Sequence, residues 1–213
     1  MTSPLILKDR DRELLAALVQ KVRLLSQKQI AEHWWQGETP NARRRLKSLV
    51  EAGLLKRLTV SARTLPPITA PLVTWQLSEV EPDFGPIAFQ LQSRWARRAV
   101  RPTTTYIASE KASQLFGGRA RGELKHPLQA THDLGVAAVW LALAELAPKW
   151  ANAWQGEDLH AVSRRGEKLP DAFIVNSAQE TVCVIEFGGA YDTARLLAFH
   201  RDCEVRAIPY QIW

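Results

Sequence analysis

The sequence predicts an α+β protein with two domains. Its first third contains three short helical segments followed by strand segments, whereas its last third alternates long helices with apolar strands. Positive charge is concentrated at one end: residues 1–65 hold 13 Lys and Arg against 6 Asp and Glu, and the remainder holds 15 against 16. These observations indicate an N-terminal domain that meets a polyanion, with nucleic acid as the first candidate.

The composition is that of a soluble globular protein. The chain has 213 residues, of which 46% are hydrophobic and 23% charged, and its length suits one large or two small domains. No apolar run approaches the roughly 18 residues of a membrane span, and the N-terminus lacks a signal-peptide core. We therefore expect a cytoplasmic protein with no membrane partner and no evident small-molecule substrate. Cys183 and Cys203 are isolated, which predicts reduced structural thiols rather than a zinc site.

The first two predicted helices follow directly from the apolar spacing. Residues 9–25 repeat leucine and valine at helical intervals, including Leu14, Leu18 and Val22. Ser26 is suited to cap a second, shorter helix over residues 27–35. Gly37 then interrupts the helical pattern.

A third helix is predicted from Thr39-Pro40, which supply an N-cap and a first-turn proline, to Gly53, a plausible C-cap. Its apolar residues share one face because they recur at intervals of three, four and seven. Arg43, Arg44 and Lys47 lie on the opposite face, with Arg45 at its flank. This helix is therefore amphipathic, with a core side and a cationic side.

Two strands are expected after this helix, over residues 54–60 and 71–78, joined as a hairpin by a loop that contains Arg63. Three helices and a hairpin are the plan of a winged helix-turn-helix domain, whose third helix enters the major groove of double-stranded DNA.

We assign this domain to residues 1–80 and expect a homodimer, since such proteins commonly bind two half-sites. RNA, a protein partner or a merely solvated basic face are the alternatives. The expected DNA contacts are Arg43, Arg44, Arg45, Lys47, Arg57 and Arg63.

Residues 81–125 are predicted to connect the two domains. They contain a probable helix around Leu91, a basic cluster from Arg94 to Arg101, and a β-rich segment over residues 103–109. A short helix closed by Gly117-Gly118 follows. The basic cluster either extends the DNA surface or forms a solvated linker face.

The C-terminal domain, residues 126–213, begins with a long, mostly apolar helix over residues 128–147. Three strands are expected at residues 152–162, 171–176 and 181–188, followed by a helix at 191–203 and a strand at 205–213. Since a helix connects the last two strands, they are expected to run parallel.

This order of elements is also the core of a PD-(D/E)xK nuclease-like α/β domain. In such enzymes, carboxylates from the second and third strands bind a hard divalent cation that activates water. Here the candidates are Asp171 and Glu186, with Glu157 as a third. The lysine expected two residues after the glutamate is replaced by Gly188, and Lys168 could substitute only if the backbone brings it to the metal.

Two interpretations of this domain stay open. In the first, the domain is catalytically degenerate and has no cofactor, and Asp171 and Glu186 are hydrogen-bonded carboxylates inside a former site. In the second, Asp171 and Glu186 bind Mg²⁺ or Mn²⁺ in a DNA endonuclease or nickase. The missing lysine favours the first. His132 and His200 are expected to be packing residues.

The chain also resembles the replication-relaxation family of bacterial plasmids and mobile elements. Six segments carry the resemblance, at residues 11–32, 42–58, 106–117, 131–143, 170–175 and 184–192. It implies a winged helix joined to a PD-(D/E)xK-like domain, and a regulator of transcription, replication or mobilisation. In the family the glutamate of the third strand is followed by an acid, whereas this chain has Glu186-Phe187-Gly188-Gly189.

Overall fold

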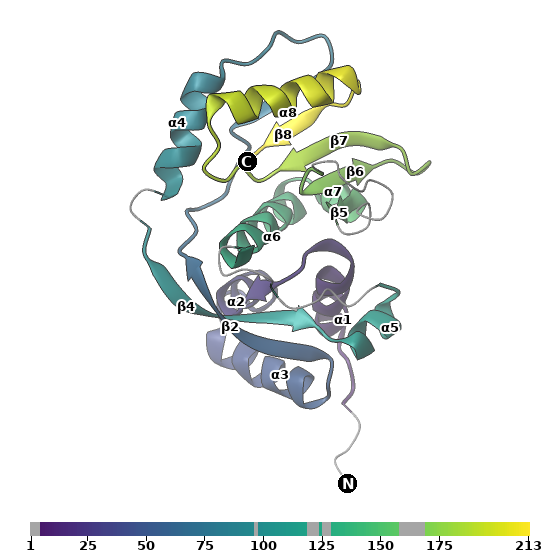
Figure 1. The fold of residues 1–213 in the computed structure, drawn as a ribbon. Helices are drawn as coiled ribbons and strands as arrows, with labels where there is room; N and C mark the ends of the chain where they lie inside the picture. The colour runs from purple at the N-terminus through teal and green to yellow at the C-terminus, as the bar shows by residue number, and fades with distance from the viewer. Residues whose placement is uncertain (1–4, 96–97, 119–123, 125–128, 158–168) are drawn as a thin grey trace. The chain divides into compact units, whose positions relative to one another are not determined.

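The computed structural model describes residues 5–95, 98–118, 124, 129–157 and 169–213. It has the mixed α+β composition that the sequence predicts (Figure 1). Backbone contacts divide the chain into two compact units: unit 1 comprises Met1–Ala62 and Val100–Ala138, and unit 2 comprises Arg63–Ala99 and Val139–Trp213. The units are therefore interleaved along the chain, whereas the sequence analysis expected contiguous segments at 1–80, 81–125 and 126–213.

Unit 1 combines helices with a small sheet. Its elements are α1 (Asp9–Ala16), the π-helical turn η1 (Ala17–Lys21), β1 (Leu25–Ser26), α2 (Gln27–Trp35), α3 (Thr39–Glu51), β2 (Leu55–Arg63), β4 (Val100–Ala108), α5 (Glu110–Phe116) and the first part of α6 (Gln129–Leu146).

Local capping chemistry explains where α2 begins and where α3 ends. The Ser26 side chain accepts a hydrogen bond from the Gln29 backbone amide at 3.1 Å, and the Gln29 side-chain Oε1 accepts one from the Ser26 backbone amide at 2.9 Å. α3 starts with Glu38 as its N-cap and ends before Gly53, whose φ of +72° favours glycine. Thr39, the predicted N-cap, is instead the first residue of α3, so the N-cap is displaced by one residue.

The sheet of unit 1 has the strand order β1-β4-β2, so β4 lies beside β2 (Figure 1). The expected hairpin between residues 54–60 and 71–78 does not form. Instead β3 (Val73–Trp75) pairs with β8 (Tyr210–Ile212) in unit 2. The reason lies in Trp75, which is buried and stacks on Tyr210 with ring centroids 5.4 Å apart.

Unit 2 is built on a five-stranded sheet with the order β3-β8-β7-β6-β5. β7 and β8 are parallel, as predicted from the helix between them, and the other neighbours are antiparallel. The remaining elements are α4 (Phe84–Trp95), α7 (Pro148–Ala153), β5 (Trp154–Gly156), β6 (Ala172–Val175), β7 (Thr181–Glu186) and α8 (Thr193–Val205). α7 was not expected from the sequence.

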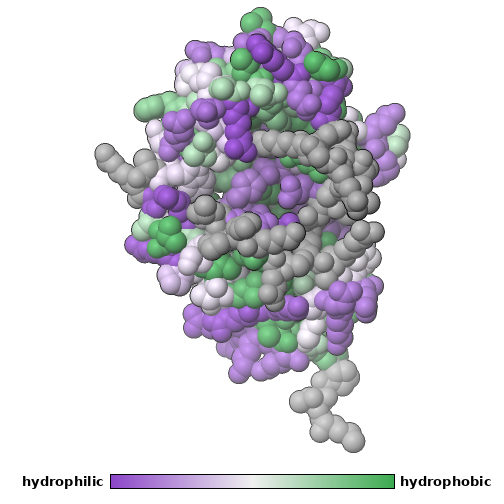
Figure 2. Space-filling view, in the orientation of Figure 1, coloured by the Kyte–Doolittle hydropathy of each residue, from purple (hydrophilic) through white to green (hydrophobic). Residues whose placement is uncertain are grey.

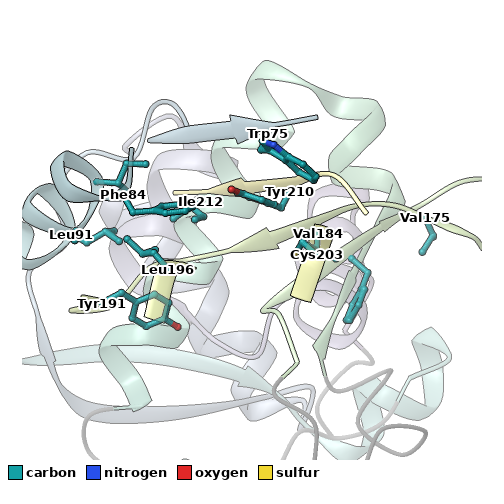
Figure 3. Close-up of a cluster of buried hydrophobic side chains, with 13 residues drawn as sticks. Trp75, Phe84, Leu91, Val175, Val184, Tyr191, Leu196, Cys203, Tyr210 and Ile212 are labelled. Carbon is teal, nitrogen blue, oxygen red and sulfur yellow. The ribbon is translucent and has the colours of Figure 1, made fainter. Parts of the chain in front are cut away.

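The core of unit 2 draws on the segment that the sequence analysis treated as a connector. Phe84 and Leu91 of α4 pack with Trp75, with Leu196 of α8 and with Ile212 of β8 (Figure 3). The segment 63–99 therefore supplies core side chains to this unit. No helix in the described part of the chain is long and apolar enough to cross a membrane.

Candidate functional site

The cationic face of α3 is exposed, as the sequence predicts. Arg43, Arg44 and Lys47 all face solvent, whereas Ala42 and Leu46 on the other side of the helix are fully buried. The surface over α3 is largely hydrophilic (Figure 2). Lys47 Nζ lies 3.7 Å from Glu51 Oε1. This ion pair is exposed to solvent, so it is weak and leaves the Lys47 charge available to a ligand.

Strand β2 adds Arg57 to this surface. Burial raises the pKa of the Tyr106 phenol, and the positive charges of Arg57 and Arg43 lower it in part. Both guanidinium groups therefore lie near enough to act electrostatically on one hydroxyl. We call Arg43, Arg44, Lys47 and Arg57 the basic ridge.

Arg45 is engaged within its own unit. Its Nε donates to Asp11 Oδ1 at 3.0 Å and its Nη2 donates to Asp11 Oδ2 and to the Ile6 carbonyl. Burial would raise the pKa of Asp11, but the hydrogen bonds from Arg45 and from the Lys8 amide lower it overall. The same pair raises the pKa of Arg45. Arg45 thus fixes α1 to α3 and is less available to DNA than its neighbours.

Arg63 is also committed internally. Its Nη1 donates to the carbonyls of Trp95 and Arg98, at 2.9 Å and 3.3 Å. These carbonyls lie at and beyond the C-terminal end of α4, where a cation stabilises the unsatisfied groups of a helix. Two of the six expected DNA contacts, Arg45 and Arg63, therefore have structural partners.

The predicted carboxylates of unit 2 do come together. Asp171 and Glu186 are 8% and 2% exposed; Asp171 directly precedes β6 and Glu186 is the last residue of β7. The Asp171 amide donates to Glu186 Oε2 at 3.3 Å, and Asp171 Oδ2 accepts the Phe187 amide at 2.7 Å. Each carboxylate thus accepts a hydrogen bond from the strand that carries the other.

Tyr191 is a member of this cluster that the sequence analysis missed. Its hydroxyl donates to Glu186 Oε1 at 2.5 Å. Burial, together with the nearby charge of Glu186, raises the pKa of the phenol above its ordinary value, so Tyr191 stays protonated and continues to donate. Arg195 lies over the ring, 3.8 Å from its centroid. A tyrosine five residues after the glutamate was the only sequence signal.

Gly188, the position of the missing lysine, has no room for a side chain. A Cβ atom added there would lie 2.6 Å from Cδ2 and 2.7 Å from Cδ1 of Leu91. Leu91 is fully buried, so it has little space to move aside. α4 therefore occupies the volume in which a nuclease lysine would begin.

The same carboxylates are the predicted ligands of a divalent cation, but their oxygens already have hydrogen-bond donors. Both Glu186 oxygens accept hydrogen bonds, and Glu157 joins Asp171 through its backbone, its amide donating to the Asp171 carbonyl at 3.1 Å. Lys168 lies outside the described residues. Among the residues that are described, no three His, Cys, Asp or Glu side chains form a metal-ligand group. A cation at Glu186 would compete with the Tyr191 hydroxyl and the Asp171 amide for the same two oxygens, so the observed contacts are those of a hydrogen-bonded pair.

The remaining titratable candidates are packing residues. His200 is 1% exposed, and its Nδ1 lies 3.0 Å from the Tyr210 hydroxyl. Cys183 and Cys203 are buried free thiols whose pKa burial raises to about 12. They are therefore protonated and unreactive at neutral pH.

The sequence matches no protein-family model, and comparisons with curated proteins and with solved structures give no match either. The resemblance to the replication-relaxation family therefore stays a prediction.

Proposed function

We propose that the protein binds double-stranded DNA through the basic ridge. The observation that carries the proposal is the exposure of cations on α3 and β2 at one surface. Within the described residues, Arg43, Arg44 and Arg57 form no ion pair, so their charges are available to a polyanion. Arginine donates in a planar fork that suits both phosphate oxygens and guanine edges.

The topology of unit 1 supports a winged helix-turn-helix as the means of binding. The order α1, β1, α2, α3, β2, β4 with a β1-β4-β2 sheet is the plan of that fold. In this interpretation α3 is the recognition helix, and β2 and β4 form the wing. The segment between the two wing strands, residues 63–99, belongs to unit 2.

We further propose that unit 2 is a catalytically degenerate PD-(D/E)xK-like domain. Its helix-strand-strand-strand-helix-strand order and parallel final pair agree with that core, while Leu91 fills the space beside Gly188. A regulator of transcription, replication or mobilisation on a plasmid or mobile element, acting as a homodimer without a cofactor, is the role that the predicted family resemblance suggests.

Duplex binding at a series of salt concentrations tests the proposal. The double variant Arg43→Ala/Arg57→Ala should lose affinity, and the slope of log K against log salt should become shallower by about 1 for each lost phosphate contact. Arg201→Ala, an exposed arginine on α8, is the matched control. Equal binding by the double variant and the control would place the interface elsewhere.

A metal-dependent endonuclease or nickase is the second candidate, and the adjacency of Asp171 and Glu186 favours it. Supercoiled plasmid incubated with the protein and Mn²⁺ or Mg²⁺ distinguishes the two. Nicking that disappears in Asp171→Asn and Glu186→Gln would establish the enzyme and overturn the degenerate interpretation. Intact plasmid in all samples supports the first proposal.

A further inference from the structure

Unit 1 contains a hollow beside the basic ridge, on the flank of α3 that faces α1. Its volume is about 530 Å³, within the range of small-ligand sites. Lys8 and Arg10 line it from the start of α1, while Asn41 and Arg44 line it from α3. Arg44 therefore belongs to both the hollow and the ridge.

The charge of the hollow is positive after its internal pairs are considered. Asp11 also lines it, but this carboxylate is 1% exposed and is paired with Arg45, and the charge of Lys8 acts on it more weakly. The other charged side chains that line the hollow are three cations, Lys8, Arg10 and Arg44, and one anion, Asp9. In the described part of the chain these three cations form no ion pair, so the hollow has a cationic excess for an anion to satisfy.

An aromatic wall sets the position of one of these cations. The Arg10 guanidinium lies 5.0 Å from the ring centroid of Trp35, which also lines the hollow. Stacking of this kind orients a guanidinium while leaving its edge donors able to bind oxygens. Arg10 is thus held at the hollow by a contact that does not consume its charge.

We propose that this hollow binds a phosphate group, held by Lys8, Arg10 and Arg44. Resting on the proposed DNA-binding function, the inference assigns that phosphate first to the backbone of the duplex that the ridge contacts, because Arg44 is shared. A free phosphomonoester, such as a mononucleotide, offers the same chemistry. Binding at the hollow orients the duplex relative to α3 without reading its sequence.

The first arm of the test measures duplex affinity across salt concentrations for Lys8→Ala and Arg10→Gln. Each variant should bind about fivefold more weakly at 0.1 M salt, with the slope shallower by about 1. Arg12→Ala is the matched control, because Arg12 is an exposed arginine of α1 that does not line the hollow. It should leave the slope unchanged.

The second arm titrates adenosine monophosphate and inorganic phosphate into the wild type and Arg10→Gln, followed by the NMR signal of the Trp35 indole. Saturable shifts that the variant loses assign the hollow to a free phosphomonoester; loss in the duplex arm alone assigns it to the DNA backbone. If Lys8→Ala and Arg10→Gln bind the duplex as Arg12→Ala does, and the wild type and Arg10→Gln give the same result in the second arm, the inference is overturned. If Lys8→Ala and Arg10→Gln weaken duplex binding but Arg43→Ala/Arg57→Ala does not, the proposal for the basic ridge is wrong and the phosphate site in the hollow is supported.

Discussion

At the scale of single residues, neighbouring arginines on α3 have different tasks. Arg44 faces solvent and is available to a ligand, whereas Arg45 is bound to a buried carboxylate. A helical wheel places Arg45 at the flank of the cationic face, but it cannot reveal Asp11, which lies on another helix. Tyr191 was missed for the same reason, since its bond to Glu186 depends on how the chain turns after β7.

Substitution should separate these two roles. Arg45→Ala leaves the Asp11 carboxylate buried without its main partner, so we expect the free energy of unfolding to fall by about 2 kcal/mol. Arg44→Ala should change stability by less than about 0.5 kcal/mol and instead weaken DNA binding. Urea unfolding beside duplex titration gives both quantities. Similar stability for the two variants would contradict the structural role of Arg45.

The Asp11–Arg45 pair also predicts a pH dependence. The folded state lowers the pKa of Asp11, so its contribution to stability is complete above the unfolded value of about 3.9 and is lost as pH falls through the folded pKa. Wild-type protein should therefore lose more stability than Asp11→Asn on acidification from about pH 5 to pH 2. Urea midpoints at several pH values measure this. Parallel pH profiles would exclude the contribution.

At the scale of elements, helix ends were easier to predict than strand partners. Ser26 and Gly53 act on backbone groups within a few residues of themselves, so both partners of each interaction can be read from one short stretch of sequence. Strand pairing instead depends on distant segments. Residues 71–78 and 103–109 are both β-rich, and the burial of Trp75 against Tyr210 favours the pairing of residues 73–75 with β8, which leaves β4 beside β2.

The contact between α4 and the end of β7 leads to a second substitution test. Gly188→Ala should destabilise the protein by about 1–3 kcal/mol, because its Cβ meets Leu91 at 2.6 Å. Gly189→Ala is the control, since its Cβ would meet Tyr191 no closer than 3.4 Å. Urea unfolding compares the two.

The double variant Gly188→Ala/Leu91→Ala identifies the cause. If the clash with Leu91 is responsible, the double variant loses less stability than the sum of the single losses. Additive losses would assign the effect of Gly188→Ala to something other than Leu91.

At the scale of the whole molecule, the two units are interleaved along the chain, because each is built from two separate segments. The alternation of helix and strand predicted the mixed fold and the parallel pair of β7 and β8 correctly. It did not reveal that residues 63–99 supply β3 and α4 to unit 2. A turn-rich segment with a basic cluster has the local properties of a linker. Its apolar residues become buried only when they pack against a sheet formed by distant parts of the sequence.

Fragments cut at the boundaries that the sequence suggested should therefore fail to fold. Residues 1–80 lack β4, the middle strand of the unit 1 sheet, and residues 126–213 lack β3 and α4 from the core of unit 2. We expect broad, poorly dispersed NMR spectra from each fragment. A cooperative unfolding transition from either one would show that the exchanged segments are dispensable.

The interleaving also sets an order for folding during synthesis. Unit 1 can close its sheet once β4 has left the ribosome, but β3 has no strand to join until β8, near the end of the chain, is made. Until then the apolar residues of α4 and β3 stay exposed to chaperones and to aggregation. Long-range pairing of this kind slows folding, so the synthesis of β8 determines when unit 2 can complete its sheet and avoid misassembly.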